Sequence, residues 1–231
     1  PFLYRTTFLP FHILPVFLMI RFLRWLFFTV IVHPFLLIAI GVNIRNRENL
    51  PSSGPAVIVA NHNSHLDALM LMTLLPMRML PRIHPVAAED YFLKNRLLAW
   101  FSVNIIGIIP ITRKYILGKP DPLMPVYDAI EDGRILIVFP EGSRGQPEHL
   151  AAFKKGIAHL TSHFPDVPVV PDFMHGLGKT LPKGKYIPVP HICDVFIGEP
   201  LKGEPDVNLF MEKLRSSFET LSQQHQFPKW K

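Results

Sequence analysis

A histidine and an aspartate at short spacing are the residues of this sequence that most directly suggest chemistry. His62 and Asp67 lie in a polar stretch that begins where the apolar run 56–60 ends. On a turn that opens a helix, the two side chains are about one helical turn apart. The carboxylate can then accept the proton of one imidazole nitrogen and leave the other nitrogen as a base for a substrate hydroxyl. The structural alternative is that His62 caps the helix and Asp67 favours its first turn.

A second polar cluster follows the apolar run 134–139. It is a short loop with a carboxylate, a glycine, a hydroxyl and a guanidinium, supplied by Glu141, Gly142, Ser143 and Arg144. A glycine lets backbone N–H groups approach an anion, and an arginine can hold a phosphate with two hydrogen bonds. The alternative is an ordinary surface turn. Arg113 similarly ends an apolar run, and as a surface residue it would need no special role.

Apolar runs alternate with segments of helical periodicity along most of the chain, which predicts an α/β fold with helices on both faces of the sheet. We expect strands at 56–60, 83–88, 105–111, 134–139, 167–173 and from 192. Helices are expected after Ser64 and at 90–101, 121–131, 150–163 and 207–221. Pro168 and Pro171 predict that the strand at 167–173 lies at an edge or carries a bulge. The single cysteine, Cys193, is expected to be a small buried residue.

The N-terminal segment is apolar and contains no acidic residue between positions 11 and 44. We expect residues 1–49 to form membrane-associating helices and residues 50–231 to form the α/β domain, with a turn-rich linker at 50–55. Two short helices that dip into one leaflet are the preferred interpretation, with Arg21 and Arg24 reaching lipid phosphates. A single kinked transmembrane helix is the alternative.

The formal net charge of +6 indicates a polyanionic partner. Nucleic-acid-binding proteins spread basic residues over a polar face, whereas this chain mixes them into apolar segments. The composition therefore favours an anionic membrane surface and excludes a nucleic-acid partner.

Four ordered blocks resemble the glycerolipid acyltransferase family, typified by 1-acylglycerol-3-phosphate acyltransferases. The first is N-H-x-S-x-x-D, which contains His62 and Asp67, and the third is the F-P-E-G-S-R sequence at 139–144. The second is G-I-I-P-I-T-R, which ends at Arg113, and it carries Pro110 where the family usually has an aromatic or aliphatic residue. The fourth is V-V-P, with Val170 and Pro171.

The resemblance implies the family's mixed, largely parallel sheet with an N-terminal hydrophobic segment, and a role for each block. His62 and Asp67 would be catalytic. The acceptor would be held by Arg113, Glu141, Gly142, Ser143 and Arg144. Val170 and Pro171 would lie near the acyl donor or the oxyanion.

The implied reaction moves an acyl group from acyl-CoA or acyl-carrier-protein to the free hydroxyl of a lysophospholipid, most readily 1-acylglycerol-3-phosphate, giving phosphatidic acid. The resemblance implies neither a metal nor a bound cofactor, and a location at the cytoplasmic face of a bacterial inner membrane. Alternatives are another lysolipid acceptor (such as a lyso-ornithine lipid or lysophosphatidylethanolamine), a thioester hydrolase, and a non-catalytic lipid-binding protein. His62, His65 and Asp67 also form an H-x-x-H-x-D pattern that would suit a divalent ion.

Overall fold

The computed structural model describes residues 14–92, 95–113, 118, 121–143, 145, 150–180, 189 and 191–224. In this part of the chain, seven strands form one sheet in the order β1-β7-β6-β2-β5-β3-β4. The strands are β1 (Ile40–Arg45), β2 (Ala56–Ala60), β3 (Ile83–Ala88), β4 (Ile109–Ile111), β5 (Ile135–Val138), β6 (Val169–His175) and β7 (His191–Ile197). Neighbouring strands are parallel except for β6 and β7, so the predicted mixed, largely parallel sheet is confirmed.

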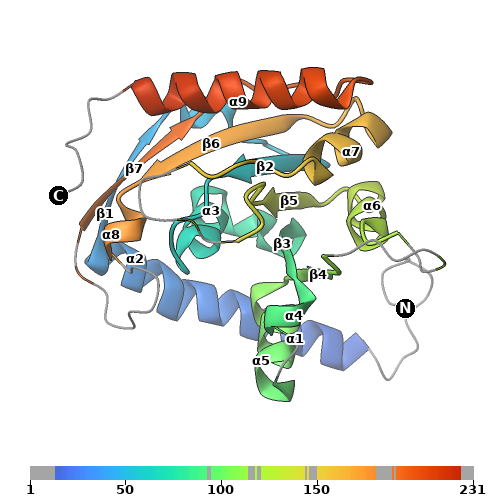
Figure 1. Ribbon diagram of the computed structural model, residues 1–231. Helices are drawn as coiled ribbons and strands as arrows, with labels where there is room; N and C mark the ends of the chain where they lie inside the picture. The colour runs from blue at the N-terminus through green and yellow to red at the C-terminus, as the bar shows by residue number, and fades with distance from the viewer. Residues whose placement is uncertain are drawn as a thin grey trace.

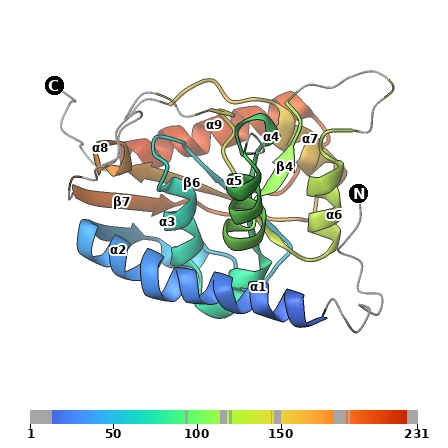
Figure 2. The ribbon, with the colours of Figure 1, turned by 90° about the horizontal axis from the view of Figure 1, so that it is seen from below.

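Helices cover both faces of this sheet (Figures 1 and 2). They are α1 (Leu14–Phe27), α2 (His33–Ala39), α3 (Asp67–Leu74), α4 (Glu89–Phe92), α5 (Arg96–Phe101), α6 (Met124–Glu131), α7 (Gly156–His163), α8 (Leu177–Thr180) and α9 (Val207–Gln223). The longest, α9, lies across one face, and the α1–α2 segment runs along the other (Figure 1). The layered architecture is the one that α/β sheets use to bury both of their faces.

The central strand β2 is buried along its whole length and separates two apolar clusters. Its alternating side chains belong to both: Ile58 packs in the cluster that includes α3, and Val57 and Val59 pack in the cluster with α9. The α9 side of the core is built by residues at helical spacing, namely Phe210, Leu214, Phe218 and Leu221. This two-sided burial explains why β2 reads as a continuous apolar run in the sequence.

Strand β6 differs from its prediction, because it lies in the middle of the sheet between β2 and β7 rather than at an edge. Pro168 precedes the strand. Pro171 lies where the antiparallel pairing with β7 begins, and its carbonyl accepts the Gly198 N–H at 2.8 Å. The missing N–H of Pro171 therefore falls at the end of a ladder, where it interrupts no run of hydrogen bonds.

Two predicted helices are shorter than expected. The expected helix at 150–163 begins only at Gly156, since the Lys154 N–H donates to the Pro140 carbonyl at 2.8 Å instead of to a helical turn. The expected helix at 90–101 is represented by α4 and α5, and the side chain of Asn95 caps the N-terminus of α5 by accepting the Leu97 N–H. Asp90 lies inside α4.

The N-terminal helices form one continuous helical segment from Leu14 to Ile38, and not two separate helices. A π-helical turn, Phe28–Val32, joins α1 to α2, and in it the His33 N–H donates to the Phe28 carbonyl. This wider turn directly before Pro34 accommodates the proline ring without breaking the helix. By length and composition the segment could cross a membrane. The strand that follows it, β1, pairs with β7, so residues 40–45 belong to the sheet although the predicted boundary grouped them with the helices.

Arg24 does not reach toward lipid, as the sequence suggested, but is buried against the α/β domain. Its guanidinium donates to the carbonyl of Ile83 at 2.6 Å and to that of Ile106 at 3.1 Å. Gly107 allows this approach, because it has a φ of +80° and a Cβ there would lie 2.6 Å from the guanidinium. The helix is therefore fixed to the turn that leads into β4. Arg21 is exposed.

His84 lies beside this turn and stays neutral. Its Nδ1–H donates to the Gly107 carbonyl at 2.7 Å, and its Nε2 accepts from Arg134 at 3.0 Å. Burial, together with the charges of Arg24 and Arg134, lowers the pKa of His84 to about 3.

Asp172 is the most unusual residue of the core. It is completely buried in β6, and neither carboxylate oxygen has a hydrogen-bond partner among the described residues. Burial raises the pKa of this carboxyl well above its ordinary value. The Asp172 side chain is therefore protonated over a range of pH in which exposed aspartates are charged.

This burial predicts a pH-dependent stability that Asp172→Asn removes. A carboxyl with a raised pKa contributes its full stability only below the pKa of the unfolded chain, about 3.9. That contribution is lost as the pH rises through the folded-state pKa. We expect the melting temperature of the wild type to fall more steeply than that of the variant between pH 5 and 8. Thermal unfolding would show this, with exposed Asp166→Asn as the control, and parallel curves for wild type and Asp172→Asn would contradict it.

Candidate active site

The site is built at the carboxyl end of β2, where the chain leaves the buried strand. His62 Nδ1 lies 2.9 Å from Asp67 Oδ2. Since one ring nitrogen faces the carboxylate, Nε2 is the nitrogen left to exchange a proton with a substrate. The structure thus brings together the two residues that the sequence analysis paired.

Asp67 also holds the loop that carries the histidine. The same Oδ2 accepts the backbone N–H groups of Asn63 at 2.7 Å and Ser64 at 2.8 Å, and the side chain is only 1% exposed. The loop therefore presents His62 to Asp67 in a fixed orientation. The expected helix-capping role for His62 is not observed, because α3 begins after Leu66 without a side-chain cap.

The third sequence block and the glycine after it hold the backbone of His62. The His62 N–H donates to Glu141 Oε1 at 3.0 Å, and the Gly145 N–H donates to the His62 carbonyl at 2.9 Å. Burial raises the pKa of Glu141, while the hydrogen bond from the His62 backbone acts in the opposite direction. Glu141, which the resemblance assigned to the acceptor, thus makes its observed contact with the backbone of His62.

Phe139 stacks on the imidazole ring of His62. The ring centroids are 4.1 Å apart and the planes are 21° from parallel. This contact restricts rotation of the histidine about its side-chain bonds. Phe139 is the first residue of the third block and directly follows β5, but no role was predicted for it.

The ammonium group of Lys154 lies close to Gly142 in this loop. Gly142 has a φ of +70°, and a Cβ at this position would lie 2.6 Å from the Lys154 Nζ. The positive φ is the backbone conformation that favours glycine at this position. Lys154 precedes α7 and is exposed, and its ammonium group lies over this loop.

A cavity of about 1070 Å³ opens in front of His62. Its wall combines the ends of β3, β4 and β5 with the facing sides of α6 and α7. Much of the lining is apolar, as in Leu69, Val86, Ile108, Ile111, Val126 and Leu160. Among the described residues, the Arg and Lys side chains that line it are Arg113 and Lys154, and Ser143 of the third block also contributes. The cavity therefore suits an amphiphile with an acyl chain and an anionic headgroup.

The other predicted site residues have different surroundings. Arg113 lies at the cavity, is 45% exposed, and forms an ion pair with Asp90 at 3.3 Å. Val170 and Pro171 are buried in β6 beside β2 and do not line the cavity, because the middle of a sheet covered on both faces is closed to a substrate. Arg144 lies outside the described residues.

The H-x-x-H-x-D pattern does not form a metal site in the described part of the chain. There, no three His, Cys, Asp or Glu side chains gather closely enough to hold an ion.

The comparison with protein families decides the classification. The family model described as Acyltransferase matches residues 41–174, which include every residue of the site described above. The chain belongs to the acyltransferase family. The match covers more than half of the chain and contains all four of the blocks identified in the sequence.

Relatives in this acyltransferase family include characterised enzymes from distant organisms. The chain is 30% identical to the chloroplastic 1-acyl-sn-glycerol-3-phosphate acyltransferase LPAT1 of Arabidopsis thaliana, over 71% of this chain and 43% of that protein. It is 32% identical to the human 1-acyl-sn-glycerol-3-phosphate acyltransferase alpha, over 62% of this chain and 49% of that protein. The chain thus spans about half the length of these two relatives.

A solved structure shares the acyltransferase fold of this chain. The 1-acyl-sn-glycerophosphate (LPA) acyltransferase PlsC from Thermotoga maritima superimposes with a TM-score of 0.66 at 21% identity, over 93% of this chain and 82% of that one. The likeness extends over both the α/β sheet and most of the remaining chain.

Proposed function

We propose that this protein transfers an acyl group from a thioester to the free hydroxyl of a 1-acylglycerol-3-phosphate, producing phosphatidic acid. The observation that carries the proposal is the His62–Asp67 pair, joined at 2.9 Å, at the wall of a cavity with apolar and cationic lining. Family membership and the named relatives support the same reaction.

In this mechanism His62 Nε2 takes the proton of the acceptor hydroxyl as its oxygen attacks the thioester carbonyl carbon. Asp67 keeps the imidazole in the required tautomer and stabilises the imidazolium. The tetrahedral oxyanion then collapses, the carbon–sulfur bond breaks, and the departing thiolate takes the proton from His62. The products are the new ester and the free thiol of coenzyme A or acyl-carrier-protein, and no bound cofactor takes part.

The cationic residues would select the acceptor. Arg113 and Lys154 both line the cavity, and Arg144 belongs to the same sequence block as Gly142 and Ser143. We propose that they bind the acceptor phosphate, so that the lysolipid hydroxyl and not water meets His62. The helical segment Leu14–Ile38 would hold the enzyme at the leaflet that supplies the acceptor, at the cytoplasmic face of a bacterial inner membrane.

The direct test is acyl transfer from a radiolabelled acyl thioester to a panel of acceptors. The panel contains lysophosphatidic acid, lysophosphatidylethanolamine, lysophosphatidylglycerol, glycerol-3-phosphate and lyso-ornithine lipid, each tried with acyl-CoA and with acyl-carrier-protein. A diacyl product from lysophosphatidic acid is expected. Free fatty acid alone would instead identify a thioester hydrolase. The absence of turnover with every donor would leave a lipid-binding protein or an acceptor headgroup that is not in the panel.

The acceptor role of Arg113 gives a second prediction. Arg113→Met is expected to raise the KM for lysophosphatidic acid by about tenfold or more and to leave kcat nearly unchanged. The reason is that a phosphate contact remote from the reacting atoms stabilises the bound substrate and the transition state equally. Steady-state kinetics would measure both constants. A phosphate-free monoacylglycerol is the matched control, because its transfer should be insensitive to the substitution. An unchanged KM for lysophosphatidic acid would leave Arg113 as the ion-pair partner of Asp90 only.

A further inference from the structure

The exposed apolar side chains of this protein are concentrated on two helical segments that lie far apart in the sequence. Nineteen large hydrophobic side chains are exposed in the described part of the chain, and eleven of them lie between Leu14 and Ile38. Three more lie on α5, namely Leu97 (80% exposed), Leu98 (41%) and Trp100 (47%). The other five are scattered over the rest of the chain. Such a concentration marks an interaction surface.

The two segments are neighbours in space. Figures 1 and 2 show α5 beside α1, and the rings of Phe27 and Phe101 pack edge to face with centroids 5.2 Å apart. The α5 helix projects beyond α1 on the side of the molecule opposite α9 (Figure 1). The apolar faces of the two segments therefore form one continuous surface.

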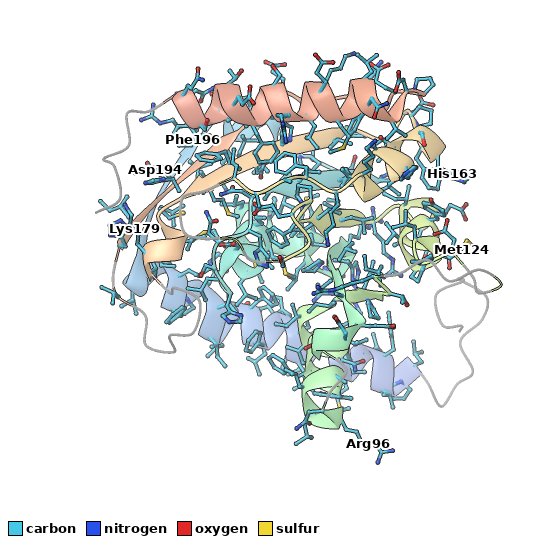
Figure 3. All side chains as sticks on the ribbon, in the orientation of Figure 1. Arg96, Met124, His163, Lys179, Asp194 and Phe196 are labelled. Carbon is cyan, nitrogen blue, oxygen red and sulfur yellow. The ribbon has the colours of Figure 1, made fainter. Side chains whose placement is uncertain are left out.

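The exposed charges on the two segments themselves are positive. Neither the segment Leu14–Ile38 nor α5 contains an acidic residue, and Arg21 and Arg96 are both exposed. Figure 3 shows the Arg96 side chain at the tip of α5, directed away from the body of the protein. Long arginine side chains keep their charge in the headgroup layer while their stems lie along apolar material. An apolar surface with exposed arginines complements an anionic lipid leaflet and not a protein partner with a polar surface.

The surface is also continuous with the candidate active site. The π-helical turn Ser102–Ile106 continues directly from α5, and Ile106 lines the cavity that contains His62. An acyl chain that leaves the leaflet along α5 would meet the wall of this cavity next.

We propose that α5 is a second lipid-inserting element and that it forms, with the segment Leu14–Ile38, one docking surface for an anionic phospholipid leaflet. This inference rests on the proposed membrane location of the N-terminal helix. It adds a second contact with the membrane, formed by a helix that begins 58 residues after Ile38. The α5 helix enters the acyl layer beside α1, and Arg21 and Arg96 pair with lipid phosphates.

Tryptophan fluorescence tests the inference without reference to activity. The chain has three tryptophans, Trp25, Trp100 and Trp230. Two full-length variants each keep one tryptophan of the surface, Trp25 in the first and Trp100 in the second, with the others changed to phenylalanine. Both are mixed with vesicles of phosphatidylethanolamine and phosphatidylglycerol whose acyl chains carry bromine. We expect quenching of Trp100 as well as Trp25. Quenching of Trp25 alone would overturn the role of α5, and quenching of neither would overturn the membrane location itself.

Vesicle flotation gives an independent measurement. The full-length variant Leu97→Glu/Leu98→Glu is expected to partition into these vesicles at least about tenfold more weakly than the wild type, because two buried apolar side chains are lost from the acyl layer. Acidic residues suit the first turn of a helix, so the variant should fold. The matched control is Leu209→Glu on α9, an exposed leucine on the opposite face, which should bind like the wild type. Equal partitioning of the double variant and the control would contradict the inference.

Discussion

Replacing His62 with alanine is expected to reduce acyl transfer by at least about 10³-fold, because the change removes the imidazole that Asp67 positions to take the hydroxyl proton. The loss should appear in kcat and in kcat/KM alike, since the acceptor headgroup and the acyl chain keep their contacts. The measurement is the rate of diacyl product formation at saturating acceptor and donor. The fold should persist, because the His62 backbone keeps its hydrogen bonds with Glu141 and Gly145.

The neighbouring histidine supplies the control for this experiment. His65 lines the same cavity but is exposed, and it is not the partner of Asp67. His65→Ala should therefore keep a rate within a few-fold of the wild type. Turnover of His62→Ala at the wild-type rate would contradict the proposed base, and equal losses in the two variants would point to an effect on cavity shape.

Asp67→Asn is expected to lower kcat by about 10²–10⁴-fold while leaving the acceptor KM within a few-fold of the wild type. The carboxylate oxygen Oδ2 accepts from His62 Nδ1 and from two backbone N–H groups. A carboxamide in this place is neutral and stabilises the imidazolium less, and if its NH2 group faces His62 the tautomer that leaves Nε2 free is lost. The histidine remains present but is misoriented or carries its proton on the wrong nitrogen.

Effects on kcat and on the stability of the fold must be distinguished in the Asp67 variant, because the same carboxylate accepts hydrogen bonds from the loop that carries His62. The rate should be measured well below the melting temperature, which we expect to fall modestly. Asp128→Asn, an exposed aspartate on α6, should change neither quantity. A loss of stability with full kcat would assign Asp67 a structural role only.

Two strands were predicted with their observed bounds, because their burial is visible in local composition. Residues 56–60 and 83–88 have the predicted bounds, and each is a run of apolar residues bounded by turns. The expected strand at 105–111 was wrong in its first part, since Ser102–Ile106 is a π-helical turn and β4 covers only Ile109–Ile111. The position of β6 in the sheet was not predictable in this way. It depends on which neighbour each strand meets, and Pro171 is tolerated only because the pairing with β7 begins at that point.

The candidate site was predictable only where its contacts are local. His62 and Asp67 are five residues apart, and the short loop between them folds back onto the Asp67 carboxylate. Glu141, by contrast, contacts the backbone of His62 across 79 residues, and Lys154 reaches Gly142 because its own helix starts later than its sequence suggests. Neither contact has a signature in local periodicity. Both require the relative placement of β2 and β5, which only the folded sheet supplies.

Arg24 adds a polar connection between the N-terminal helical segment and the wall of the cavity, beside the apolar packing of that segment. Its guanidinium holds the carbonyls of Ile83 and Ile106 at once, and Ile106 is part of the cavity wall. A rotation or tilt of the N-terminal helix therefore has to displace that wall or break a buried, charged hydrogen bond. If the helix lies in a bilayer, as proposed above, a change in bilayer thickness that tilts the helix would also change the width of this cavity.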